Sequence, residues 1–277
     1  MNRATDPTPG PGPSRRVALV TGAARGIGAA TVRGLVEAGW AVVAVDRASD
    51  DPRLPYAMGT AEELDETAAA AGRVGPGSAV AHVADTTDPV ALGAAVAVAE
   101  QRFGGLDAVI AVAGVIAGGA PLWEMPEEQL RAVIDVDLLG PVTAARVGIP
   151  ALLRRPAPRD GRFIAVASAA ATRGLPGLAA YCAAKAGVAG LVRALAADLR
   201  GTGLTATGVS PGSTTTAMLD ESARLYRLDS LETFADQPPI ERLLDPAEVA
   251  AALVWLAGPF SGAVTGAVLS VDGGLAL

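Results

Sequence analysis

The chain of 277 residues has few of the side chains on which disulfides, metal clusters and basic surfaces depend. It contains one cysteine and one histidine, so no disulfide can form within it, and a histidine/cysteine metal cluster is excluded by count. Its net charge is −7 and it has no basic run, which argues against nucleic acid or an anionic membrane as a partner. Aromatic residues make up only 4%, so alanine, valine and leucine must fill the core. A reducing, cytoplasmic location fits this composition.

Targeting and membrane-spanning patterns are also missing. Residues 1–16 are rich in proline and glycine and have no apolar signal core, so we predict a flexible N-terminal tail. Apolar runs elsewhere are interrupted by glycine or charge before they reach the length of a membrane span. We therefore expect one folded domain over 17–277 and no membrane partner.

What the chain does contain is an alternation of short β-branched runs with alanine-rich stretches. The runs predict strands at 17–22, 41–46, 78–85, 106–114, 161–168, 204–210 and 266–273. The stretches between them predict helices at about 26–39, 61–73, 89–103, 126–153, 177–201 and 246–257. Because the strand candidates lack clean polar alternation, we expect burial on both faces. This predicts an α/β fold, a Rossmann-type doubly wound parallel sheet of about seven strands with helices on both faces.

Two long segments interrupt this rhythm. Residues 47–60 separate the second strand from the next helix, where about two to six residues are usual. Residues 214–246 follow the sixth strand, and we expect them to form a substrate lid, because long loops in compact domains are commonly lids or binding loops. For the insertion at 47–60, a surface segment without a role is the alternative.

The first strand runs into a glycine-rich turn, TGAARGIG at 21–28. Gly22, Gly26 and Gly28 would let the backbone turn sharply and approach a pyrophosphate at a helix N-terminus, where free N–H groups attract anions. The spacing differs from the common G-x-G-x-x-G pattern, and the same glycines could serve the turn alone.

An acidic residue, Asp46, closes the second strand 18 residues after Gly28. A carboxylate there can accept hydrogen bonds from both ribose hydroxyls of NAD and would repel the 2′-phosphate of NADP. Arg25 and Arg47 leave NADP open, since either could pair with a phosphate. We favour NAD, and a solvated acid at a strand end is the alternative for Asp46.

Later strand ends provide further candidates for the cofactor pocket. Asp85 ends the third strand, where it could hold an adenine amino group with Thr86 beside it, although a turn or helix-capping role is the alternative. Ala113 and Gly114 end the fourth strand, and their small size would let the backbone pass close to the adenosine ribose.

The only lysine of the chain, Lys185, lies four residues after Tyr181, so both share one helix face. Ser168 ends the preceding strand, and strand ends and helix starts of such a sheet face one crevice. A free tyrosine has a pKa of ~10, and a nearby ammonium lowers it by favouring the phenolate. Tyr181 could then take the proton of an alcohol while a hydride leaves the carbon, and Ser168 could hydrogen-bond the developing oxyanion. An ordinary amphipathic helix with a half-buried tyrosine is the alternative.

Together these motifs resemble the classical short-chain dehydrogenase/reductase family over essentially the whole of 17–277. The resemblance also rests on SPGSTTT at 210–216 and VTGAVLSVDGG at 264–274, in the expected order. It implies the strand order 3-2-1-4-5-6-7, NAD(P) at the carboxyl ends of the strands and a homotetramer. It implies Tyr181 as general acid/base, Ser168 as oxyanion partner and Lys185 as the activator that binds the ribose. The further cofactor contacts that it implies are Ile27, Pro211, Gly212, Ser213, Thr214 and Thr216.

The resemblance extends to the subgroup associated with mycofactocin, a peptide-derived redox carrier. It is carried by GAARGIGAATV, by the insertion at 47–60, by AGVIAGGAPLWE at 113–124 and by the stretch 165–187. Members of this subgroup are thought to hold NAD without ready exchange while the carrier accepts the electrons. Residues 47–60 would then pack over the bound cofactor.

Two positions depart from the family pattern. The fourth strand ends in AVAG at 111–114, where the family has Asn-Asn-Ala-Gly. The family's fourth catalytic residue is an asparagine, and the matching segment at 135–140 places Asp137 there; the chain has a single asparagine, Asn2. A carboxylate accepts hydrogen bonds but lacks the amide donor. Asp137 could preserve, retune or impair the proton relay, and the sequence leaves all three open.

The motifs predict an NAD-dependent enzyme that interconverts a secondary alcohol and a ketone. Its substrate would be hydrophobic, because the candidate lining is apolar: Trp123, Leu175, Leu178, Met218, Leu219, Leu225 and Tyr226. An exchangeable NAD(P)H-dependent reductase of the 3-oxoacyl or dihydrodiol type is the main alternative, and a non-catalytic NAD-binding sensor is the second.

We expect Lys185→Arg to lose most of the activity while the protein stays folded. The guanidinium is planar, wider than an ammonium and more dispersed in charge, so it is a poor replacement beside a catalytic phenol. Turnover of a panel of secondary alcohols, with circular dichroism as the check on folding, tests this. An arginine variant with full turnover would show that a compact ammonium is not required.

Overall fold

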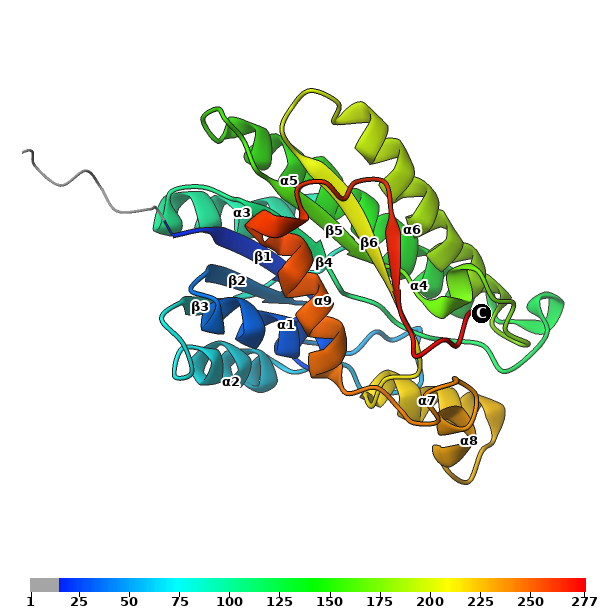
Figure 1. Cartoon of the computed structure of the whole chain (residues 1–277). Helices are drawn as coiled ribbons and strands as arrows, with labels where there is room; N and C mark the ends of the chain where they lie inside the picture. Colours follow the sequence, from blue (N-terminus) through cyan, green and yellow to red (C-terminus); the bar gives the residue numbers. More distant parts are fainter. Residues whose placement is uncertain (1–14) are drawn as a thin grey trace, which may run out of the picture.

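The computed structural model describes residues 15–277, so most of the predicted tail lies outside the described residues. Seven parallel strands form one sheet in the order β3-β2-β1-β4-β5-β6-β7, which confirms the predicted topology (Figure 1). Most strands are fully buried, whereas the edge strands β3 and β7 are partly exposed. The bounds are β1 Val17–Thr21, β2 Ala41–Asp46, β3 Ser78–Val83, β4 Ala108–Ala111, β5 Arg162–Val166, β6 Thr205–Pro211 and β7 Val268–Val271.

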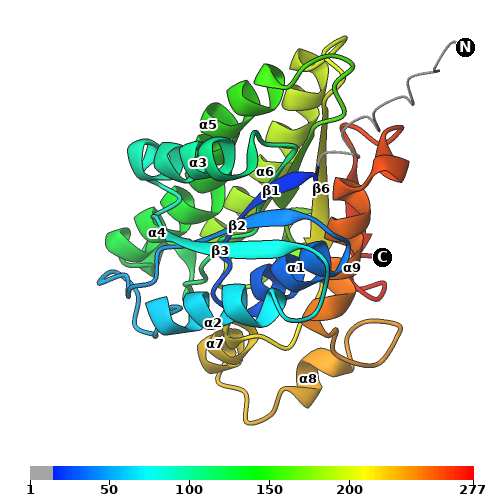
Figure 2. The same cartoon turned by 90° about the vertical axis from the view of Figure 1, so that its left-hand side faces the viewer.

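Helices cover both faces of the sheet (Figure 1, Figure 2). One face carries α1 (Gly26–Glu37), α2 (Ala61–Ala71) and α9 (Pro246–Ala257). The other carries α3 (Pro89–Phe103), α5 (Gly140–Arg154) and α6 (Ala179–Asp198). The stretch Glu127–Arg154 and helix α6 are apolar and long enough to cross a membrane. In this fold 56% and 39% of their apolar windows are buried, and side chains such as Ala144 and Val188 pack on the sheet.

Each of the two long segments ends at a helix whose first turn is capped by its own residues. Thr60 and Glu63 form a capping box at the start of α2, which ends the insertion 47–60. Asp245 and Glu248 form a second capping box at the start of α9, which ends the segment 214–246. The ends of both segments are therefore determined by residues that accept hydrogen bonds from the free N–H groups of a helix N-terminus.

The helix predicted at 126–153 is not continuous. It consists of α4 (Glu127–Ile134), a π-helical turn at Asp135–Leu139 and α5. Pro141, in the first turn of α5, has no N–H to donate to the carbonyl of residue 137, so regular α-helical bonding is interrupted there. Such π turns are frequent at functional sites, and this one contains Asp137.

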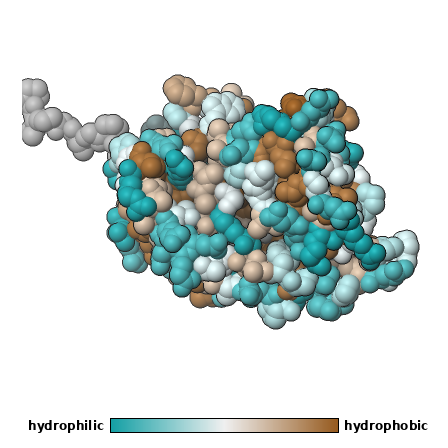
Figure 3. Space-filling view, turned by 90° about the horizontal axis from the view of Figure 1, so that it is seen from below, coloured by the Kyte–Doolittle hydropathy of each residue, from teal (hydrophilic) through white to brown (hydrophobic). Residues whose placement is uncertain are grey.

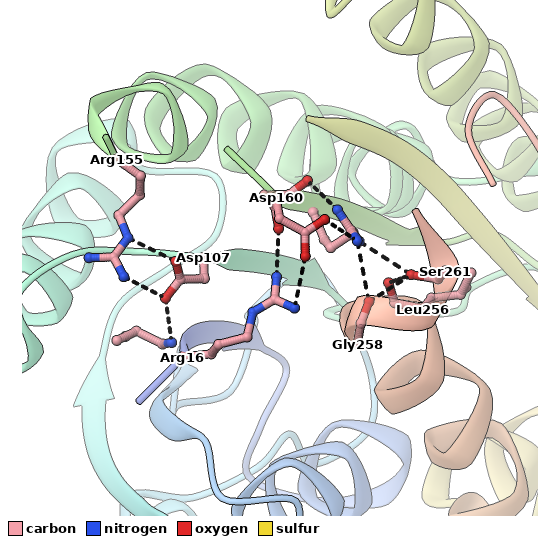
Figure 4. A network of polar contacts seen from close by, with 10 residues as sticks. Arg16, Asp107, Arg155, Asp160, Leu256, Gly258 and Ser261 are labelled. Carbon is pink, nitrogen blue, oxygen red and sulfur yellow. Dashed lines mark hydrogen bonds and ion pairs between the residues drawn. The ribbon is translucent and has the colours of Figure 1, made fainter. Parts of the chain in front are cut away.

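At the edge opposite the carboxyl ends of the strands, a polar network joins distant parts of the chain (Figure 4). The side chain of Arg162, at the start of β5, is 1% exposed. It donates hydrogen bonds to Ser261 Oγ at 3.2 Å and to the Gly258 carbonyl at 3.3 Å, and it pairs with Asp160. Asp160 also pairs with Arg16, just before β1, at 3.4 Å. The network thus connects β1, β5 and the end of α9.

We expect Arg162→Met to lower the free energy of unfolding by about 1–3 kcal/mol, because the hydrogen bonds of the guanidinium to Ser261 Oγ and to the Gly258 carbonyl are lost. Arg154→Met is the matched control. Arg154 pairs with Glu100 on the surface, with a side chain 56% exposed, and an exposed pair contributes about 0–1 kcal/mol. Urea unfolding of both variants at one protein concentration is the measurement. Equal losses would show that the buried network has no special weight.

Candidate active site

A cavity of about 300 Å³ lies at the carboxyl ends of the strands. The glycine-rich turn, the ends of β2, β4, β5 and β6, the insertion 47–60 and the lid 214–246 all contribute to its lining. It brings together nearly all residues predicted to bind the cofactor or act in catalysis: Gly22, Arg25, Gly26, Ile27, Gly28, Asp46, Arg47, Asp85, Thr86, Ala113, Gly114, Ser168, Tyr181, Lys185, Pro211, Gly212, Ser213, Thr214 and Thr216. Asp137 lies behind this lining, against Lys185.

The glycine-rich turn is shaped to approach a ligand closely. Gly22 has a φ of +67°, and a Cβ there would stand 2.7 Å from the Ala113 backbone, so another residue would be strained. Helix α1 begins at Gly26, and no side chain caps its first N–H groups. These N–H groups are available to an anion such as a pyrophosphate.

The strand-end acid Asp46 faces the same cavity. One carboxylate oxygen accepts a hydrogen bond from Ala24 N at 3.0 Å and the other from Ala48 N at 3.2 Å. A carboxylate has about four acceptor positions, so it can still bind ribose hydroxyls. Both arginines that left NADP open have protein partners: Arg25 donates to the Ala57 carbonyl, and Arg47 pairs with Asp51 at 2.7 Å. The arrangement fits NAD better than NADP.

The end of β3 combines a turn role with a place in the cavity wall. Asp85 accepts hydrogen bonds from the backbone N and the hydroxyl of Thr87 at 2.8 and 2.7 Å. These bonds fit the turn role that was the alternative to binding adenine. Beside it, the buried Thr86 hydroxyl has no hydrogen-bond partner in the described part of the chain. Buried polar groups are normally satisfied, so this hydroxyl fits a site that receives a polar ligand.

Tyr181, Lys185 and Ser168 meet in the cavity wall. Tyr181 and Lys185 are both buried on one face of α6, and the lysine Nζ lies 5.6 Å from the centre of the tyrosine ring. Ser168 follows β5, and its Oγ accepts a hydrogen bond from Ala170 N at 3.1 Å. The tyrosine hydroxyl faces the lid, with Met218 Sδ at 4.0 Å.

Lys185 forms a buried ion pair with Asp137. Their Nζ and Oδ1 atoms are 2.9 Å apart, and the two side chains are 3% and 0% exposed. The ammonium also donates to the Val166 carbonyl at 3.3 Å, while both carboxylate oxygens accept from Val115 N at 3.3–3.4 Å. Burial raises the pKa of Asp137, and the lysine opposes this rise. Burial also disfavours the charged lysine, but Asp137 and Tyr181 more than offset it, so the pKa of Lys185 lies above its ordinary value.

The expectation that Lys185 lowers the pKa of Tyr181 below its usual value is wrong for the protein alone. Burial raises this pKa, and the attraction of Lys185 only partly opposes the rise. Asp137 raises it further, whereas the neighbouring Ser168 hydroxyl lowers it. The phenol is therefore protonated near neutral pH and is ready to donate a proton.

The insertion 47–60 is built into the site. The Asp51 carboxylate is 2% exposed and binds Arg47 and Arg53, which hold its pKa far below the usual range. Arg53 continues to Asp135, in the π turn, at 2.6 Å. Tyr56 accepts a hydrogen bond from Ile116 N at 2.8 Å and packs in the same apolar cluster as Tyr181. These contacts place the insertion in the wall of the cavity.

The predicted lid 214–246 contains α7 (Ala217–Tyr226) and α8 (Glu232–Ala235). On the face seen from below in Figure 3, hydrophilic residues cover most of the surface and hydrophobic ones form separate patches. The cavity itself is mostly apolar beneath the lid. Leu175, Leu178, Met218, Leu219 and Tyr226 line it as predicted.

Two predicted lining residues do not line this cavity. Trp123 is 85% exposed on a short 3₁₀ turn, Leu122–Glu124. Leu225 lines a second hollow, together with Pro55 and Arg227. Their apolar character did not distinguish surface from lining. The sequence reasoning also missed Tyr56 and Phe234, which line the cavity from the insertion and α8. Their position inside the two long segments was the available signal.

The comparisons with known proteins agree with this geometry. Residues 22–276 match the family model described as enoyl-(acyl carrier protein) reductase. The chain is 37% identical to cis-4-hydroxycyclohexanecarboxylate dehydrogenase of Sinomonas cyclohexanicum over 94% of this chain and 96% of that protein. It is 33% identical to (-)-trans-carveol dehydrogenase of Rhodococcus erythropolis over 95% and 98%. It also resembles the crystal structure of carveol dehydrogenase from Mycobacterium avium in complex with NAD, with a TM-score of 0.86, 30% identity and coverage of 94% and 97%.

Fold, site and comparisons together define an oxidoreductase with a Rossmann-type sheet. The chain belongs to the short-chain dehydrogenase/reductase family.

We expect Gly114→Ala to reduce turnover on the order of 100-fold, because a Cβ there would stand 2.8 Å from Asp137 Oδ1 and shift the ion pair. Gly190→Ala on α6 is the matched control, since its Cβ would meet nothing within 4 Å. That control is expected to keep its activity and to gain about 0.5–1 kcal/mol of stability. Steady-state kinetics and thermal unfolding check both. Full activity of Gly114→Ala would mean that the pair tolerates displacement.

Proposed function

We propose that the protein is an NAD-dependent dehydrogenase that interconverts a hydrophobic secondary alcohol and a ketone, and that it holds NAD tightly while a mycofactocin-type carrier re-oxidises it. The observation that carries the activity is the cluster of Ser168, Tyr181 and Lys185 beside the glycine-rich turn in one cavity. The dehydrogenase relatives and the NAD complex of a structural neighbour support the same class of reaction.

The residues present suit this chemistry. When bound, NAD supplies the acceptor or donor of the hydride. In the reductive direction Tyr181 donates its proton to the carbonyl oxygen, and in the oxidative direction it takes the proton of the hydroxyl. Ser168 stabilises the oxygen as charge develops on it. The apolar lining under the lid excludes water and accepts a hydrocarbon framework.

The insertion supports the proposal of a held cofactor. Six of its residues line the cavity next to Asp46, which would face the ribose: Arg47, Ser49, Asp51, Tyr56, Met58 and Gly59. Its backbone is tied to the glycine-rich turn through Arg25 and the Ala57 carbonyl at 2.7 Å. Release of NAD would require this anchored segment to move. A separate carrier would then collect the electrons without release of the dinucleotide.

A cytoplasmic homotetramer belongs to the same proposal. Three apolar side chains are exposed near the edge strand β7: Trp255 on α9 (46%), Phe260 on the turn that follows α9 (89%) and Leu269 on β7 itself (40%). Apolar side chains gathered at an edge of a sheet suit contact with another copy of the chain.

The specific alternative is a reductase with exchangeable NAD(P)H. It is favoured by the 32% identity to 3-oxoacyl-[acyl-carrier-protein] reductase of Thermotoga maritima. The two proposals differ in whether dinucleotide remains with the purified protein.

We expect purified protein to retain close to one NAD per chain through gel filtration, as measured by absorbance and mass spectrometry. Arg53→Met should speed NAD exchange at least about tenfold, the effect of losing about 1.4 kcal/mol of binding, because Arg53 joins Asp51 to Asp135. Arg131→Met, which removes an exposed arginine of α4, is the control expected to retain NAD. Cofactor-free protein that turns over added NADH would instead establish the exchangeable reductase.

A further inference from the structure

The one lysine of the chain is bound by a carboxylate where the family pattern has an amide. Asp137 and Lys185 are 2.9 Å apart, and neither side chain is more than 3% exposed. Val115 N also donates to the carboxylate, and the absence of a side chain at Gly114 leaves the space that Asp137 Oδ1 occupies. The π turn gives Asp137 this position between α4 and α5. The surrounding backbone therefore fixes Asp137 in contact with Lys185.

We propose that Asp137 is a positioning residue that neutralises Lys185 and thereby keeps Tyr181 in its protonated, proton-donating form around neutral pH. An asparagine at this position would leave the ammonium as the only charge beside the phenol. The carboxylate adds a negative charge to the same buried cluster, and in a poorly solvated site this charge acts with little screening. The protein would thus favour proton donation to a ketone near neutral pH and proton uptake from an alcohol at higher pH.

No other group described around Tyr181 offsets the positive charge of Lys185 as Asp137 does. On α6, Cys182 follows the tyrosine, and at the end of β5 the Ser168 hydroxyl is a neutral neighbour. Tyr56, from the insertion, is neutral, and burial raises its pKa. On α7, Glu221 is already paired with Arg224 at 2.7 Å. Asp137 is thus the carboxylate in contact with Lys185, and it decides how much positive charge the phenol experiences.

The test is a spectroscopic titration of Tyr181 that needs no substrate. The chain has three tyrosines, so the tyrosinate absorbance of the intact protein minus that of its Tyr181→Phe counterpart reports this residue. We expect Asp137→Asn to lower the midpoint by about one to three pH units, because the ammonium is then uncompensated. Asp135→Asn is the matched control. It removes the same charge from the same π turn, but Asp135 pairs with Arg53 and its side chain is 39% exposed, so the Tyr181 midpoint should not move.

Asp137→Ala removes the same charge with a different loss of volume, and it replaces the asparagine variant if circular dichroism shows that variant to be unfolded. A midpoint that stays unchanged or rises in the folded variant overturns the proposal. So does an equal fall in Asp135→Asn, which would indicate a general loss of negative charge.

A kinetic measurement extends the test and rests on the proposed function. In the folded Asp137→Asn variant, the alkaline rise of kcat/KM for alcohol oxidation should move to lower pH with the titration midpoint, and activity at neutral pH should be kept or raised. Loss of all turnover with the titration shift intact would contradict the kinetic role of Asp137 alone. Failure of wild-type protein to oxidise any alcohol would count against the proposed function and leave the titration to decide the role of Asp137.

Discussion

All seven strands run in the same direction, and helices on both faces keep the sheet buried. A parallel sheet places the carboxyl ends of its strands along one edge, so the turns that leave those ends must share a crevice. The glycine-rich turn, Asp46 and Ser168 occur far apart in the chain and meet for this reason. At the amino ends of the strands no ligand has to bind. There Arg162 and its partners connect the starts of the strands. The candidate site and the buried polar network therefore lie at opposite ends of the strands.

Two further elements turn this common scaffold into a particular site. The insertion 47–60 lines the cavity and is fixed there by the ion pairs of Asp51 with Arg47 and Arg53. The π turn between α4 and α5 presents Asp137 to Lys185 on one side and Asp135 to Arg53 on the other. The insertion and Lys185 are thus both paired with carboxylates of a single turn of helix. Charge compensation at Lys185 then determines how readily Tyr181 exchanges its proton.

Much of this organisation could be predicted from the residues. The parallel sheet between two layers of helices followed from apolar runs without alternation, and its strand order followed from the family resemblance. The capping boxes at Thr60 and Asp245 mark where both long segments end. The cavity also contains the motif residues, from Gly22 to Thr216, that the sequence assigned to it. Other features depend on atoms that only folding brings together. Trp123 and Leu178 were both predicted to line the substrate pocket, but the first is exposed and the second buried. The direction of the Tyr181 pKa could not be predicted either, since it depends on burial, and burial is a property of the packed molecule.

The lone lysine illustrates the division. The sequence by itself determined that Lys185 shares a helix face with Tyr181, because a spacing of four residues does so in any α-helix. It also determined that an aspartate occupies the position of the family's asparagine. Only the tertiary structure decided that the two residues meet as a buried ion pair, with 2.9 Å between Nζ and Oδ1. That decision depends on a π turn, on the absence of a side chain at Gly114 and on the exclusion of water, and each of these arises when separate segments pack against one another.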